Sequence, residues 1–257
     1  MNQLLATLRH MPKKPAEVFS SLGMILLFMT AHFAHHLVNA LPIPLLPMIR
    51  HDFGLDYTQA GLLVAAFTIP YGISQFPAGW LADRWGPQIL LSLGICGVAV
   101  AGLLAGLSQN YQFVFVCLVA MGVVGGGYHP ASPPLISSVV EPQRLGRAMG
   151  LHMVGGSAPF FLTPLIAVAL AMVWGWRGAF IALAFPTLLL GIFFHILLAR
   201  RLRAAAAPAS SIKSPQQEES APHRSSHGIV PFIVLSTFTQ AFSYCVIAFV
   251  PLYLVDR

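Results

Sequence analysis

Charged residues are scarce in this chain, and long stretches of it contain none. Asp, Glu, Lys and Arg together make up only 9% of the 257 residues, whereas hydrophobic residues make up 56%. Ordinary soluble domains carry roughly a quarter of charged residues, so the composition excludes a typical soluble globular protein. The eight acidic residues all fall in predicted loops or near the ends of apolar runs. The sequence therefore predicts an all-α integral membrane protein with no carboxylate deep in its helices.

Cysteine is also rare, and its positions exclude a second class of protein. The three residues, Cys96, Cys117 and Cys245, all lie inside apolar runs. Small secreted domains held together by disulfides place several cysteines in polar, loop-rich segments. We therefore expect these three to be small packing residues.

Seven apolar runs are long enough to cross the hydrocarbon core of a bilayer, which takes about 20 residues. They lie near 22–47, 57–81, 88–108, 111–139, 148–173, 177–199 and 229–254. The first run follows Lys13 and Lys14, as a signal peptide would. Its apolar stretch is too long for a signal peptide and lacks a clear cleavage site, so we expect it to remain as a helix.

The basic residues lie between the apolar runs rather than on one folded face. The formal net charge of +6 therefore does not predict binding of nucleic acid. If the amino terminus is cytoplasmic, eleven of the fourteen Lys and Arg residues lie in cytoplasmic segments, and only Arg50, Arg177 and Arg257 lie in outer ones. Because basic loops resist translocation, the sequence predicts a multi-pass protein of the plasma (inner) membrane with a cytoplasmic amino terminus.

A short polar segment, residues 79–86, separates the second and third runs. Gly79 and Gly86 are expected to let the chain turn and the helices approach closely. The Asp83 carboxylate can accept hydrogen bonds from a helix amino terminus, and Arg84 can donate to a carbonyl or a phosphate. The pattern Gly-x-Leu-Ala-Asp-Arg-x-Gly resembles the signature loop of the major facilitator superfamily of secondary transporters. An Asp-Arg pair that merely marks a solvated turn is the alternative.

The resemblance implies two six-helix bundles that rock around a site at the membrane midplane. Residues 1–199 are then the amino-terminal bundle, and 229–257 the first helix of a second, incomplete bundle. Residues 200–228, rich in Ala, Ser, Pro and Gln, are expected to be a flexible cytoplasmic linker. We expect either a fragment of a twelve-helix carrier or a truncated chain that requires the missing bundle or a second copy.

Other segments resemble the fosmidomycin-resistance branch of drug-efflux carriers. They are His36-Leu37-Val38-Asn39, Leu45-Leu46-Pro47, Tyr128-His129-Pro130, and Gly155-Gly156 with Pro164. The chain departs from the pattern of the branch in two places. Ala40 and Ala131 stand where acids are expected, and Pro87 and Gln88 replace the basic residues that usually follow the signature loop.

The ionisable groups inside the predicted spans are histidines. His32, His35, His36 and Asn39 lie three and four residues apart, so they share one face of the first helix. On the fifth helix a second stripe is formed by His152, Gly155, Gly156, Pro159 and Thr163. We expect the prolines at 130, 133 and 134 to break the fourth helix beside His129. Polar groups in lipid need water or protein partners, so the sequence predicts a transport pathway lined by His32, His35, His36, Asn39, His129 and His152; packing alone is the alternative for each.

Three pairs of glycines occur in the pattern Gly-x-x-x-Gly, which places two glycines one turn apart on the same helix face. The pairs are Gly102 with Gly106, Gly122 with Gly126, and Gly146 with Gly150. Such pairs predict close crossings between membrane helices. They carry no information about the substrate.

The favoured function is a secondary transporter, an efflux carrier for a small organic molecule, with His36, Asn39 and His129 along the path. Imidazole changes charge near pH 6.5, so histidines could replace the missing acids and make protons a coupling partner. The alternative is a transport-incompetent membrane protein with an assembly or regulatory role. An enzyme or receptor is disfavoured, because the seventh span has no lysine for retinal and the chain has no His-Glu-x-x-His motif. The triplet His32, His35 and His36 lacks an obvious carboxylate partner, so the sequence predicts neither a metal site nor a cofactor.

Overall fold

The computed structural model describes residues 15–206 and individual residues between 231 and 254. Within these residues every regular element is a helix and none is a strand. The helices are α2 (Pro15–Asn39), α3 (Pro42–Phe53), α4 (Tyr57–Trp85), α5 (Pro87–Gly106), α6 (Tyr111–Gly125), α7 (Tyr128–Val139), the short 3-10 helix η1 (Pro142–Arg144) and α8 (Leu145–Ala206). The predicted all-helical fold is confirmed for the described part of the chain.

The first six predicted spans correspond to these helices. α2 and α3 form the first span, which reaches Phe53 rather than residue 47, and α6 and α7 form the fourth. α8 contains both the fifth and the sixth spans. The backbone turns at Gly175, where φ is 70° and ψ is 171°, and this turn separates the two spans. The predicted linker begins at residue 200, yet α8 continues to Ala206. The linker residues after 206 lie outside the described ones. In the seventh span the described residues are helical.

Four helical stretches are long and apolar enough to cross a membrane by length and composition. They are Leu22–Phe53, Pro87–Gly106, Tyr111–Val139 and Pro142–Arg203. α4 is not among them because polar side chains, including Tyr71, Ser74 and Gln75, and two internal prolines lower its mean hydropathy. Of these polar residues, Tyr71 lines the site described below.

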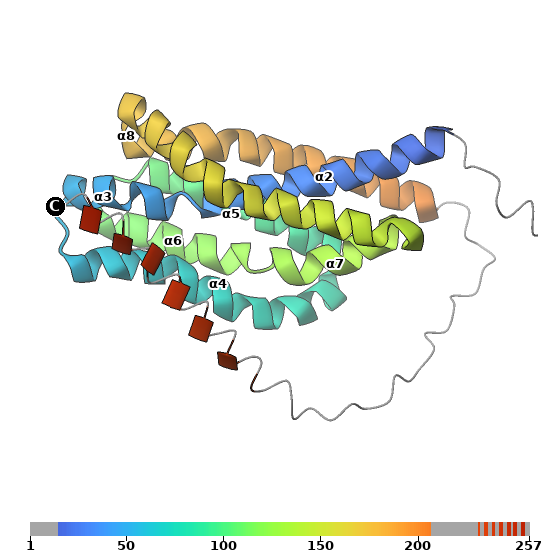
Figure 1. Ribbon diagram of the computed structural model, residues 1–257, viewed down its shortest axis with the longest axis horizontal. Helices are drawn as coiled ribbons and strands as arrows, with labels where there is room; N and C mark the ends of the chain where they lie inside the picture. Colours follow the sequence, from blue (N-terminus) through green and yellow to red (C-terminus); the bar gives the residue numbers. More distant parts are fainter. Residues whose placement is uncertain are drawn as a thin grey trace, which may run out of the picture.

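The helices lie side by side in one elongated bundle (Figure 1). α2 packs mainly on α8, α5 on α8 and α6, and α4 on α6. Two apolar clusters fill the interior. One includes Ile25, Phe28 and Phe194, and the other includes Val38 and Leu45. On α2 the histidines 32, 35 and 36 therefore lie between the two clusters, which places a polar layer midway along the bundle.

The fourth span breaks at a different place from the one predicted. The interruption lies at Gly126–Gly127, and α7 continues through the prolines at 130, 133 and 134. Pro130 is in the first turn of α7, where a backbone N–H has no partner within the helix. The prolines at 133 and 134 leave carbonyls without their usual i+4 donors, and the Ser132 hydroxyl donates to the carbonyl of His129 at 3.4 Å.

Most of the segment 79–86, which resembles the signature loop, is helical, and the connection between its two helices is a single residue. α4 ends at Trp85 and α5 begins at Pro87, so Gly86, with φ of 89°, makes the turn alone. Gly79 instead lies inside α4, with open space where a Cβ would be. Asp83 is exposed and accepts no hydrogen bond from a described residue. The Arg84 guanidinium lies 5.4 Å from the centre of the Trp80 ring.

At the opposite end of the bundle, Arg177 joins three spans. Its Nη1 donates to Asp52 Oδ2 at 2.7 Å, and its Nε donates to the Ser108 carbonyl at 2.6 Å. Trp176 Nε1 also donates to Asp52 Oδ2, at 3.2 Å. These contacts tie the end of α3 and the end of α5 to the start of the sixth span, and so close this end of the bundle.

Two of the three predicted glycine crossings are present. A Cβ at Gly102 would lie 2.8 Å from Val38 Cγ1, and one at Gly106 would lie 2.9 Å from the Arg177 carbonyl oxygen. Gly122 and Gly126 of α6 likewise touch the backbone of α4. Gly146 and Gly150 show no crossing in the described part of the chain, because no described atom outside the local helix lies within 4 Å of a Cβ at either position.

Candidate functional site

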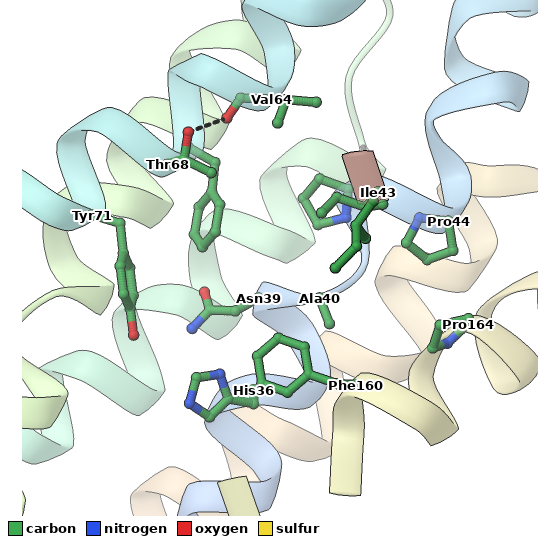
Figure 2. Close-up of a pocket in the computed structure, with 13 residues that line it drawn as sticks. His36, Asn39, Ala40, Ile43, Pro44, Val64, Thr68, Tyr71, Phe160 and Pro164 are labelled. Carbon is green, nitrogen blue, oxygen red and sulfur yellow. Dashed lines mark hydrogen bonds between the residues drawn. The ribbon is translucent and has the colours of Figure 1, made fainter. Parts of the chain in front are cut away.

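A cavity opens between the α2–α3 junction, α4 and the first half of α8 (Figure 2). Its polar side chains are His36, Asn39, Thr68 and Tyr71, and the remaining lining is apolar. The apolar residues are Ala40, Pro42, Ile43, Pro44, Val64, Phe67, Phe160, Pro164 and Ile247. Thus the described lining contains no Asp, Glu, Lys or Arg. A mostly apolar pocket with a few convergent polar groups is typical of a small-molecule site.

The first span is broken beside the cavity. α2 ends at Asn39 and α3 begins at Pro42, so residues 40 and 41 form a turn in the middle of the span. Proline has no N–H and clashes with the preceding helical turn, and Pro42 and Pro44 together prevent α2 from continuing. Irregular backbone at membrane depth is tolerated where protein buries it or a cavity lies beside it.

Asn39 connects this cavity to the buried polar layer. Its Nδ2 donates to His35 Nε2 at 2.9 Å, and the Nδ1 of His35 lies 3.0 Å from the Gly94 carbonyl. Because Nε2 accepts, we assign the His35 proton to Nδ1. The Tyr71 hydroxyl lies 3.4 Å from the same Nε2. The other polar atom of the amide, Asn39 Oδ1, is buried and has no hydrogen-bond partner among the described residues.

His32 and His152 form a second buried pair. Their rings stack with centroids 4.0 Å apart, and His32 Nδ1 lies 2.7 Å from the His152 carbonyl. His152 Nδ1 in turn lies 3.3 Å from the Phe28 carbonyl. Both residues are 2% exposed, so they are held by α2 and α8 rather than by solvent.

The six predicted pathway residues therefore separate into two groups. Only His36 and Asn39 line the cavity. His32, His35 and His152 are buried in the helix packing beneath it, and the His129 ring lies 5.3 Å from that of His36 without lining the cavity. The predicted polar stripe on the fifth helix does not form a cavity wall, since Gly155 and Gly156 contact Met29 and His32 of α2.

Sequence reasoning missed the contribution of α4. Thr68 and Tyr71 reach the cavity from one face of this helix, and Phe160 of α8 faces His36 with ring centroids 5.3 Å apart. The available signal was the spacing of Thr68 and Tyr71, three residues apart in an otherwise apolar segment, which places both on one helix face. The low hydropathy of α4 is a second signal of the same kind.

Comparison with known proteins places this chain in a family. Residues 28–257 match the family described as Major Facilitator Superfamily. The chain is 32% identical over 180 residues to the probable L-galactonate transporter of Escherichia coli (strain K12), covering 70% of this chain and 39% of that protein. It is 24% identical over 162 residues to the fosmidomycin resistance protein of the same strain, covering 63% of this chain and 39% of that protein.

Solved structures show the same fold. A bacterial homolog of the human lysosomal transporter Spinster, in an inward-facing and occupied conformation, superposes with a TM-score of 0.66 at 19% identity. The match covers 93% of this chain and 54% of that chain. The chain thus spans less than half the length of the curated relatives given above.

Proposed function

The chain belongs to the major facilitator superfamily, and from this membership we propose that it takes part in secondary active transport of a small organic solute by alternating access. It is a multi-pass membrane protein, and its relatives are named as transporters. The cavity between α2, α4 and α8 is the proposed solute site. One observation carries the proposal: four polar side chains, His36, Asn39, Thr68 and Tyr71, converge on an otherwise apolar cavity, which is the usual lining of a small-molecule site.

We further propose export as the direction and the fosmidomycin-resistance branch as the nearest functional group. The support is the residue pattern around His36, Asn39 and His129 together with the similarity to a protein named for fosmidomycin resistance. The sequence identity is greater to a protein named for L-galactonate. Fosmidomycin and L-galactonate are therefore both suitable first probes. Protons are the coupling ion that we propose, and a protonophore should then abolish net export.

Because the relatives are more than twice as long as their matched parts, the activity of a whole carrier also needs an opposing bundle. We propose that a second bundle, or a second copy of this chain, faces the cavity across the membrane midplane. The division into a bundle (1–199), a linker (200–228) and the first helix of a second bundle (229–257) stays a prediction. The placement of Ile247 at the cavity wall supports it.

A matched pair of substitutions tests the transport proposal. Ile43→Trp should fill the cavity, whereas Ile192→Trp adds the same volume on an exposed face of α8. Cells that express the chain should retain less labelled fosmidomycin or L-galactonate than cells without it, and Ile43→Trp should restore retention while Ile192→Trp should not. Equal retention with and without the chain would exclude a second copy of this chain as the opposing bundle, and it is the result that the transport-incompetent alternative predicts. Greater retention with the chain would reverse the direction.

The proposed orientation has its own test. A cysteine in place of Lys213 should be protected from a membrane-impermeant thiol reagent in intact cells, because the excess of basic residues keeps that segment cytoplasmic. A cysteine in place of Gln109, between α5 and α6, should be labelled. The reverse pattern would place the amino terminus outside and move the Gly86 turn to the outer side.

A further inference from the structure

Three imidazoles converge beside the cavity, and one of them, His36, lines it. His32 and His36 lie one turn apart on α2, and His129 comes from the first turn of α7. One ring nitrogen from each lies within 4.8 Å of the others. The ring centroid of His32 lies 4.8 Å from that of His36 and 5.4 Å from that of His129. Histidines from two helices therefore face one common point.

His32 is oriented as a metal ligand would be. Its Nδ1 donates to the His152 carbonyl, and its ring is stacked against His152 and Tyr128. Metal-bound histidines usually donate their second ring N–H to a carbonyl or carboxylate, which fixes the tautomer and aims the other nitrogen. The carbonyl of His152 thus supplies the partner that the sequence did not reveal. The remaining nitrogen, His32 Nε2, is buried and has no partner among the described residues.

His36 and His129 can complete the site. Both rings are only partly buried, and His36 also lines the cavity. Tetrahedral zinc with bonds of about 2.0–2.1 Å places its nitrogen ligands about 3.3 Å apart, so the two rings need to rotate toward His32 by about an ångström each. Three protein ligands leave a fourth position, and the cavity beside His36 is where that position opens.

The ligand set selects the kind of ion. Neutral imidazoles suit Zn²⁺, Co²⁺, Cu²⁺ and Ni²⁺, whereas Mg²⁺ and Ca²⁺ require oxygen ligands that this cluster lacks. We propose that His32, His36 and His129 bind one divalent transition-metal ion of the zinc type, with its fourth coordination position open to the cavity. This inference stands apart from the transport proposal, because metal binding is measured without any solute.

Cobalt provides the test, because four-coordinate Co²⁺ absorbs strongly in the visible range. The tag-free chain in nanodiscs, at about pH 8, where imidazole is ordinarily neutral, should bind one Co²⁺ with a four-coordinate spectrum, and Zn²⁺ should displace it. His36→Gln and His129→Gln should each weaken binding by more than the roughly 10–100-fold that loss of an outer-shell partner causes. Zn²⁺ should raise the melting temperature of the unmodified chain and leave that of His129→Gln unchanged, which also shows that the variant folds.

The controls remove histidines elsewhere in the chain. His51→Gln, and His223→Gln combined with His227→Gln, should bind Co²⁺ as the unmodified chain does. The proposal is overturned if the unmodified chain gives no four-coordinate spectrum, if His36→Gln and His129→Gln bind normally, or if binding disappears with His223 and His227.

Discussion

Gly155→Ala is expected to destabilise the bundle strongly. A Cβ at this position would overlap the Met29 carbonyl oxygen and lie 3.0 Å from the Met29 carbonyl carbon. Both atoms belong to the backbone of α2, so no side-chain rotation relieves the overlap and the two helices must separate. Overpacking typically costs about 1–3 kcal/mol and occasionally more. Because the overlapping atoms belong to the backbone, we expect the upper part of this range, which exceeds the gain of about 1 kcal/mol in helix propensity.

Gly150→Ala on the same helix is the matched control. Outside the local helix, no described atom lies within 4 Å of a Cβ there, so only the gain in propensity acts and the stability should stay equal or rise slightly. Melting of the purified chain, followed by tryptophan fluorescence, compares the two. Equal melting temperatures for Gly155→Ala and Gly150→Ala would show that α2 and α8 do not touch at this point.

Alanine substitution of the neighbouring histidines 35 and 36 should impair different properties: stability at His35 and transport at His36. His35 is 0% exposed, stacks on Tyr128 at 4.3 Å and accepts a hydrogen bond from Asn39. His35→Ala removes a buried ring and leaves the Gly94 carbonyl without its donor. By analogy with truncation of other buried aromatic side chains, the expected loss in the free energy of unfolding is about 3–5 kcal/mol.

His36→Ala opens the cavity wall without removing a side-chain hydrogen bond to any described residue, so its cost in stability should stay below about 1 kcal/mol. Transport should follow the reverse order: among the variants that fold, His36→Ala should lose solute transport. Thermal melting and the fosmidomycin retention assay measure the two effects separately. A stable His35→Ala chain, or a His36→Ala chain that transports normally, would contradict the separation into packing and cavity residues.

The spans and the tight turn at Gly86 were predictable because hydrophobic length and a glycine between two helices are local properties of the sequence. The convergence of histidines was also visible, since the spacing of His32, His35 and His36 fixes one helix face. Which of them reaches the cavity was not visible. That depends on the turn after Asn39 and on how α4 and α8 pack around it.

The same limit applies to the glycines and to the fourth span. The sequence shows only a glycine at each of positions 150 and 155. The two positions differ in their packing, because Gly155 lies against the backbone of α2 and Gly150 does not. The break at Gly126–Gly127 was missed because prolines are the stronger local signal. Within α7 the first-turn position of Pro130 removes much of its cost, which only the observed helix boundary reveals.

The most direct test of the central claim is whether the cavity holds water in the membrane. Cys96, Cys117 and Cys245 are replaced by alanine, and a single cysteine is placed at Thr68, in the cavity, or at Val100, on an exposed face of α5. A thiol reacts as the thiolate, which water stabilises and lipid does not. A small hydrophilic thiosulfonate reagent should therefore label Thr68→Cys at least about tenfold faster than Val100→Cys. Equal, slow labelling at both positions would contradict a solute pathway between α2, α4 and α8.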